Sequence, residues 1–150
     1  MHPLLTGRLR MSLYLVFFLG IGLLLAGLLV LLEPRPFSAA LLFVGPLTLV
    51  YASICLSAWY VCRSHPPATT PALQLLGCLA GAALQSSAVW VGLGALWAVL
   101  LARAAHVGPD RAGILRDLAV LFAAGIALYA QSIVVHYFVL AFESARAAAR

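Results

Sequence analysis

The segment "MSLYLVFFLGIGLLLAGLLVLL", residues 11–32, determines which solvent this chain folds in. It carries no charged residue, and about 20 apolar residues in a helix cross the ~30 Å hydrocarbon core of a bilayer. Arg8 and Arg10 precede it, as basic residues precede the apolar part of a signal peptide. The segment is too long for a signal peptide, however, and no small-residue cleavage site follows it. We therefore predict an uncleaved first transmembrane helix.

The composition of the whole chain agrees with this first segment. Of its 150 residues, 65% are hydrophobic and 9% are charged, and the mean hydropathy is +1.09. A soluble domain needs more polar surface than this. Lipid tolerates only helices and closed barrels, and the apolar segments lack the alternation of strands. The sequence therefore predicts an all-α membrane protein, one domain of four transmembrane helices in a bundle, at residues 11–32, 37–62, 71–102 and 111–150.

The positive charge of the chain is a topology signal. The formal net charge is +5, and every basic residue apart from histidine is an arginine. In a membrane protein, arginines set orientation and contact anionic lipid headgroups, so we expect membrane lipids as partners and no nucleic acid. Arg8 and Arg10 favour a cytoplasmic N-terminus. Four spans then place the C-terminus on the cytoplasmic side as well.

The fourth predicted helix, residues 111–150, is longer than a bilayer requires. About 40 residues make a helix of ~60 Å, roughly twice the hydrocarbon core. Its C-terminal part is therefore expected to extend into the cytoplasm. Small residues recur in it with a 3.5-residue period, which is typical of a helix–helix seam, although an alanine-rich helix also produces such a seam by chance. The seam consists of Ala123, Ala127, Ala130, Val134, Tyr137 and Ala141.

A second stripe of small residues lies on the third predicted helix. It begins as a G-x-x-x-G pattern, which lets two membrane helices approach closely. The pattern leaves open whether the partner is a helix of the same chain or of another subunit. The stripe consists of Gly77, Gly81, Ala88 and Gly92.

Polar positions within the apolar segments are the candidates for sensing or signalling. Tyr129, Ser132 and His136 share one face of the fourth helix, and an ionisable group in a membrane span is a functional hypothesis by default. A structural hydrogen bond is the alternative for His136. Pro46 is expected to kink the second helix, as a flexing element or as a static bend. Gln85 lies in mid-membrane, where it lines a cavity or bonds to a neighbouring helix.

The chain lacks the residue patterns of membrane-bound chemistry. A proton-coupled exporter requires an acidic residue within the membrane core, and none is expected there in this chain. The three cysteines form no C-x-x-C pair, and no histidine or acidic cluster has metal-ligand spacing. No nucleophile can be matched to a base, and no glycine-rich phosphate loop is present. We therefore predict no catalytic, cofactor-binding or metal-binding residue in this chain.

Two segments carry a resemblance to a known family. "LRDLAVLFAAGIALYAQSIVVHYFVLAFESARAAAR", residues 115–150, resembles the last membrane helix of LytS/AlgZ-type bacterial sensor histidine kinases. Within it, "HYFVLAFESARAA", residues 136–148, is similar to the exit helix before the kinase. "LVYASICLSAWYVCR", residues 49–63, is similar to the second membrane helix of that group. The phospho-accepting histidine motif and the nucleotide-binding boxes are absent, and His136 does not match that histidine.

The resemblance implies a function for the membrane domain. The chain would be the sensory and dimerisation domain of a two-component sensor histidine kinase in the bacterial inner membrane, with both termini cytoplasmic. A kinase domain is expected after residue 150, so the parent protein would be a protein histidine kinase. The implied partners are a second copy of the chain and, through the kinase, a cognate response regulator.

Two other classes of function remain open at the level of sequence. The four helices could form a passive membrane anchor and dimeriser that senses nothing. They could also form a small transporter or channel, a reading favoured by Pro46 and the polar groups in mid-membrane.

Overall fold

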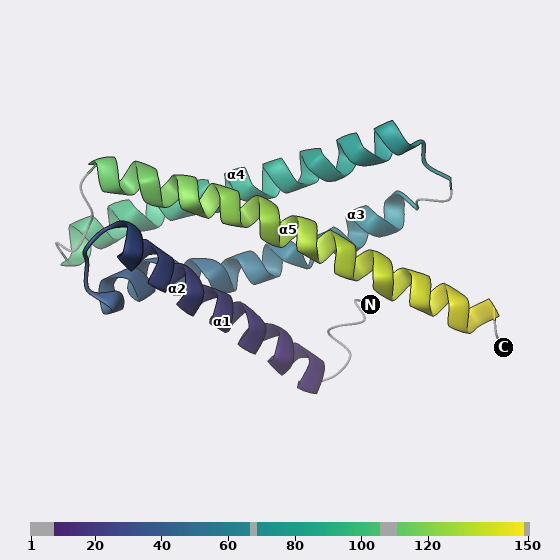
Figure 1. Ribbon diagram of the computed structural model, residues 1–150, viewed down its shortest axis with the longest axis horizontal. Coiled ribbons are helices and arrows are strands. Elements are labelled where there is room, and N and C mark those ends of the chain that lie inside the picture. The colour runs from purple at the N-terminus through teal and green to yellow at the C-terminus, as the bar shows by residue number, and fades with distance from the viewer. Residues whose placement is uncertain (1–7, 67–68, 106–110, 149–150) are drawn as a thin grey trace.

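The computed structural model of the chain describes residues 8–66, 69–105 and 111–148. Every regular element in these ranges is a helix, which confirms the all-α prediction (Figure 1). The helices are α1 (Arg8–Leu32), α2 (Phe37–Cys55), α3 (Ala58–Ser64), α4 (Ala72–Ala105) and α5 (Arg111–Ala148).

The described ranges contain four helical segments that are long and apolar enough to cross a membrane, as predicted. The second of them contains both α2 and α3. Large apolar side chains point outward along the bundle; Leu31 is 85% exposed and Leu73 is 84% exposed. An outer surface of this kind is stable against lipid and not against water. The four segments are Met11–Leu32, Phe37–Ser64, Ala72–Ala104 and Ala112–Ala147.

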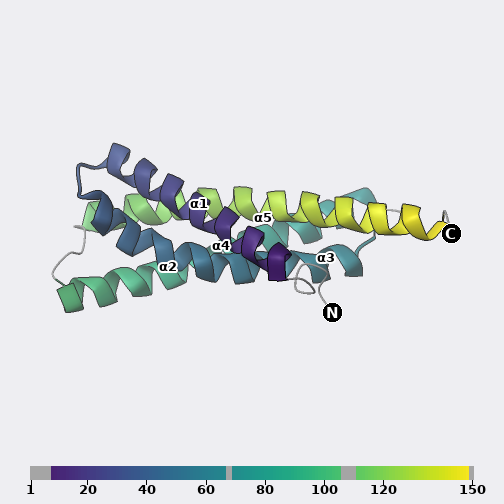
Figure 2. The ribbon, with the colours of Figure 1, turned by 90° about the horizontal axis from the view of Figure 1, so that it is seen from below.

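The helices run alternately up and down. α1 packs on α2, α2 packs on α4, and α5 packs on both α4 and α3. In the described part of the chain, α1 does not pack closely on α5. α1 begins and α5 ends toward the same end of the bundle (Figure 1). The last turns of α5 continue past the ends of the other helices (Figure 2).

The second span changes its hydrogen-bond pattern at Leu56 and Ser57, although both residues keep right-handed helical angles; we call this place the break, and the sequence analysis did not predict it. The N–H of Ser57 donates to the carbonyl oxygen of Ile54 (2.9 Å), and that of Trp59 donates to Leu56 (3.2 Å). These bonds join residues three apart, so the chain tightens for one turn before α3 begins.

Pro46, by contrast, lies inside α2, and the helix continues through it. Proline has no N–H, so it cannot donate to the carbonyl oxygen of Leu42 one turn earlier. The indole N–H of Trp97 on α4 donates to this oxygen instead (3.1 Å). A neighbouring helix thus satisfies the backbone group that Pro46 leaves open.

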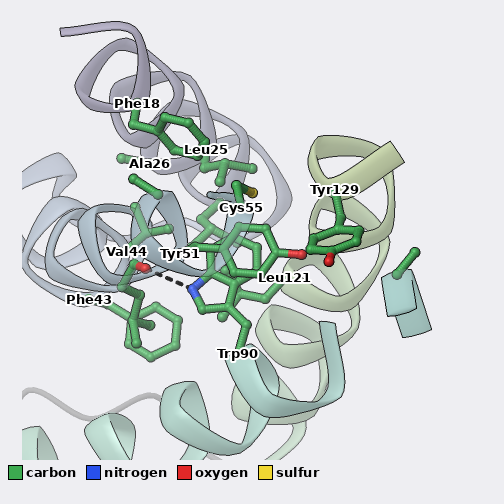
Figure 3. Close-up of a cluster of buried hydrophobic side chains, with 14 of the residues drawn as sticks. Phe18, Leu25, Ala26, Phe43, Val44, Tyr51, Cys55, Trp90, Leu121 and Tyr129 are labelled. Atoms are coloured by element: carbon green, nitrogen blue, oxygen red, sulfur yellow. Dashed lines mark hydrogen bonds between the residues drawn. The ribbon is translucent and has the colours of Figure 1, made fainter. Parts of the chain in front are cut away.

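The centre of the bundle is a stacked pair of aromatic rings (Figure 3). The rings of Tyr51 on α2 and Trp90 on α4 lie 4.2 Å apart between centroids, at 19°. The indole N–H of Trp90 donates to the carbonyl oxygen of Leu47 (2.8 Å), and the hydroxyl of Tyr51 donates to that of Gly125 on α5 (2.8 Å). These bonds join α2 to both α4 and α5 in the buried core.

Gly125 lets α5 approach α4 closely. A Cβ atom at this position would lie 2.9 Å from Oγ of Ser87 and 3.1 Å from the ring of Trp90. Both atoms belong to hydrogen-bonded side chains in the core, since Ser87 donates to Ala83 (2.8 Å). The glycine is therefore required by packing rather than by backbone conformation.

Gly125→Ala is expected to lower the free energy of unfolding by about 1–3 kcal/mol, because the added methyl overpacks the contact with Ser87 and Trp90. Thermal unfolding in detergent micelles measures this. The control is Gly27→Ala on α1, where a Cβ atom meets nothing within 4 Å; it should leave stability unchanged or slightly raised. Equal stability of the two variants would contradict the packing assignment.

Candidate functional site

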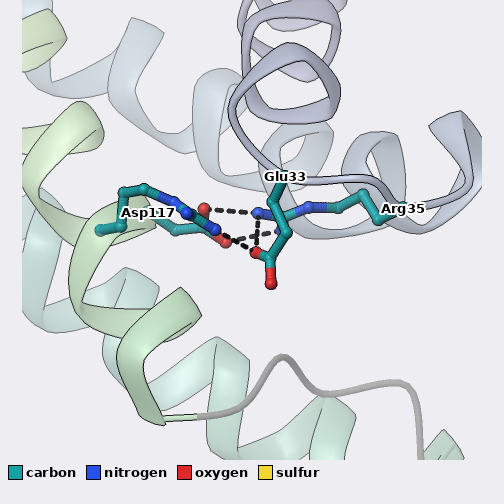
Figure 4. A network of polar contacts seen from close by, with 4 residues as sticks. Glu33, Arg35 and Asp117 are labelled. Carbon is teal, nitrogen blue, oxygen red and sulfur yellow. Dashed lines mark hydrogen bonds and ion pairs between the residues drawn. The ribbon is translucent and has the colours of Figure 1, made fainter.

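A cluster of four charged residues joins the α1–α2 connection to the first turns of α5 (Figure 4). We call Glu33, Arg35, Arg116 and Asp117 the ion cluster. The guanidinium of Arg35 donates through both terminal nitrogens to the carboxylate of Asp117, at 2.6 and 2.7 Å. Glu33 accepts from Arg35 (2.8 Å) and from Arg116 (2.6 Å). Two acids and two arginines thus form a neutral network.

The Arg35–Asp117 pair is the buried part of the ion cluster. The side chain of Asp117 is fully buried and that of Arg35 is 12% exposed, whereas that of Arg116 is 42% exposed. The hydrogen bond that Arg35 donates to Asp117 raises the pKa of Arg35 above its ordinary value, although burial acts in the opposite direction. Arg35 is therefore charged at every physiological pH. A charge buried to this degree depends on its partner.

The sequence analysis missed this pair. It expected no acidic residue within the membrane core, and Asp117 lies inside the fourth apolar segment, buried against the α1–α2 connection. The available signal was an acidic residue near the start of an apolar helix, which requires a partner. The partner was not identifiable, because Arg35 is 82 residues away in sequence.

A second group of polar contacts binds α5 to the break between α2 and α3. The hydroxyl of Ser132 donates to the carbonyl oxygen of Cys55 (2.9 Å), next to the break. The hydroxyls of Tyr129 and Ser57 lie 3.2 Å apart. Nδ1 of His136 lies 2.7 Å from the carbonyl oxygen of Ser132. We call Cys55, Ser57, Tyr129, Ser132 and His136 the break cluster.

His136 has a structural hydrogen bond in this cluster. A carbonyl oxygen only accepts, so Nδ1 carries the proton in the bond to Ser132. The imidazole is buried, and its centroid lies 5.8 Å from that of the Trp59 ring. At the next residue of α5, the hydroxyl of Tyr137 donates to the carbonyl oxygen of His65, which ends α3 (2.9 Å). α5 is therefore bonded to α3 at both ends of that short helix.

Three of the five sensing candidates, Tyr129, Ser132 and His136, thus meet at one place. Pro46 and Gln85 do not join them; both are exposed on the outer surface of the bundle. The break cluster contains hydroxyl, imidazole and carbonyl groups, and its hydroxyl groups form hydrogen bonds between α5 and the second span. In the described ranges, no group of three histidine, cysteine or acidic side chains could hold a metal ion.

The predicted packing residues lie mostly on outer faces. On α4, Gly77, Gly81, Ala88 and Gly92 are exposed. On α5, Tyr137 is half-buried, and the other seam residues are exposed, namely Ala123, Ala127, Ala130, Val134 and Ala141. Inside the bundle, close packing instead uses Gly94 and Gly125, which the sequence analysis did not single out.

Comparisons with known proteins give no relative for this fold. No protein-family model matches the chain, and the searches of curated proteins and of solved structures find no match.

Asp117→Asn is expected to destabilise the fold by about 3–5 kcal/mol, because it removes the counter-charge of a buried arginine. Thermal unfolding in micelles measures the loss. Arg116→Gln is the matched control; its partly exposed ion pair should contribute less than about 1 kcal/mol. Adding Arg35→Gln to Asp117→Asn should restore part of the stability. An Asp117→Asn variant as stable as the original protein would contradict the account of the ion cluster.

Proposed function

We propose that this chain is the sensory and dimerisation domain of a membrane-bound sensor histidine kinase, and that α5 relays a change in bundle packing out of the membrane. One observation carries the proposal. α5 is a continuous helix whose polar side chains bind the interrupted second span, while its last turns extend beyond the bundle.

The length of α5 supports its role as the output element. Its 38 residues make a helix of ~57 Å, whereas a bilayer core takes about 30 Å. Residues 141–147 are exposed without exception. A rigid helix that is packed at one end and free at the other transmits a movement from the first part to the second.

The break cluster supports the idea of two packings. Hydrogen bonds hold α5 to the break at Cys55 and Ser57, where the backbone bonds of the second span already shift to residues three apart. A signal that favours a different geometry at the break would shift the population between two arrangements of α5. Small shifts of packed helices are a common form of such switches.

The exposed seam of α5 supports a dimer. Its small residues repeat with the period of two helices that coil around each other, and the fold of one chain leaves them uncovered. In a dimer the two α5 helices would pack along Ala127, Ala130 and Val134. They would then change their packing together when the bundles shift.

The kinase part of the proposal rests on the likeness of residues 49–63 and 115–150 to the LytS/AlgZ-type sensors. On this proposal, the domain lies in the bacterial inner membrane with both termini in the cytoplasm. A kinase joined to α5 would pass its phosphoryl group to a cognate response regulator. The alternative of a passive anchor and dimeriser is favoured by the same exposed seam, and it predicts that the break cluster has no effect on output.

The full-length protein in native membranes is expected to autophosphorylate on histidine when supplied with ATP. Ser132→Ala removes the bond to Cys55 and should change the rate of autophosphorylation by about two- to tenfold, since one hydrogen bond contributes about 0.5–1.5 kcal/mol. The control is Ser86→Ala on α4, which lies outside the break cluster. Failure to phosphorylate histidine would refute the kinase, and equal rates in all three proteins would support the passive anchor.

A further inference from the structure

A groove runs between α1 and α5, which do not pack closely on each other in the described part of the chain. Its volume is about 430 Å³, within the range of small-molecule sites in proteins. Apolar side chains form most of its lining, and three polar residues of α5 complete it, namely Gln131, Ser132 and His136. The groove therefore lies directly beside the break cluster.

The α1 wall of the groove is aromatic and fixed in place. The ring of Phe18 contacts those of Tyr14 and Phe17, with centroid distances of 4.9 and 5.7 Å respectively. The hydroxyl of Tyr14 donates to the carbonyl oxygen of Ala52 on α2 (2.6 Å), so its ring is held in position. Phe18 is buried in the core. Such a wall favours a flat ring, because aromatic groups gain from stacked and edge-to-face contacts.

Gln131 is the feature of the groove that points to a polar partner. It lies well inside the fourth span, between Asp117 and Glu143, and its side chain lines the groove. Its amide has no hydrogen bond to any residue that the structure describes. The side chain is exposed on the outer surface of the bundle, so in a membrane its amide faces lipid, where an amide without a partner costs several kcal/mol. A molecule in the groove with a hydrogen-bond acceptor would remove this cost.

We infer that the groove binds a neutral, membrane-dissolved molecule with a flat ring system and a carbonyl oxygen. The rings lie against Tyr14, Phe17 and Phe18, and the carbonyl accepts a hydrogen bond from the amide of Gln131. The molecule bridges α1 and α5 next to the break cluster. As the input of the relay, this site rests on the proposed function, whereas its existence as a binding site does not.

Two matched ligands test the site. 9-Fluorenone is a flat, neutral aromatic ketone, and fluorene has the same rings without the carbonyl. Binding is measured by equilibrium dialysis with the protein in lipid nanodiscs, against empty nanodiscs. We expect saturable binding of 9-fluorenone, about five- to tenfold weaker in Gln131→Leu, because one hydrogen bond is lost. Gln85→Leu is the control; it removes an exposed amide of α4 that does not line the groove, and should leave the affinity unchanged.

Three other outcomes are possible, and each of them would contradict the proposed site. Uptake of 9-fluorenone equal to that of empty nanodiscs means that nothing binds. Equal affinity for fluorene and 9-fluorenone, unaltered by Gln131→Leu, means that the groove takes up only apolar material such as a lipid chain. A change of oligomeric state in Gln131→Leu, measured by mass photometry, means that a second copy of the chain pairs with the amide. None of these results bears on autophosphorylation, so the site and the proposed function fail separately.

Discussion

The fold depends on satisfying the backbone of its second span inside lipid. Water is absent from a bilayer core, so each carbonyl oxygen that a proline or a break frees must find a donor within the protein. α2 and α3 contain both features, Pro46 and the break at Leu56 and Ser57. Every other span donates a side-chain hydrogen bond to a carbonyl oxygen of this segment or of the residue that ends it, and two of these oxygens, those of Leu42 and Cys55, are ones that Pro46 and the break free. The donors are Tyr14, Trp90, Trp97, Ser132 and Tyr137.

This arrangement divides α5 into three parts along its length. Near its start, Asp117 forms a buried ion pair with Arg35, which fixes that end to the α1–α2 connection. In the middle, the break cluster binds α5 through neutral hydrogen bonds. The loss of one such bond costs less stability than the loss of one partner of a buried ion pair. Its last turns are exposed. A helix that is fixed near its start, packed on α4 at Gly125 and exposed at its other end moves as one body when its packing changes.

The sequence predicted the four spans because each is an apolar segment bounded by charged or proline-rich residues, as at residues 33–36. It did not predict the break at Leu56 and Ser57, because neither residue is a helix breaker and Pro46 was the more evident irregularity. The partners of Asp117 and Ser132 lie 82 and 77 residues away, and periodicity within one helix does not reveal them. Tyr129, Ser132 and His136 were identifiable, since polar groups in a span require partners.

The most direct test of the account is the distance between the two α5 helices in a dimer. A nitroxide at Ala141, in protein whose native cysteines are replaced by alanine, reports this distance by pulsed electron paramagnetic resonance in nanodiscs. The account predicts a dimer distance distribution that shifts, or gains a second population, when Ser132→Ala releases α5 from the break. Ser86→Ala should leave the distribution unchanged. Superimposable distributions in all three proteins would contradict the claim that the break cluster sets the position of α5.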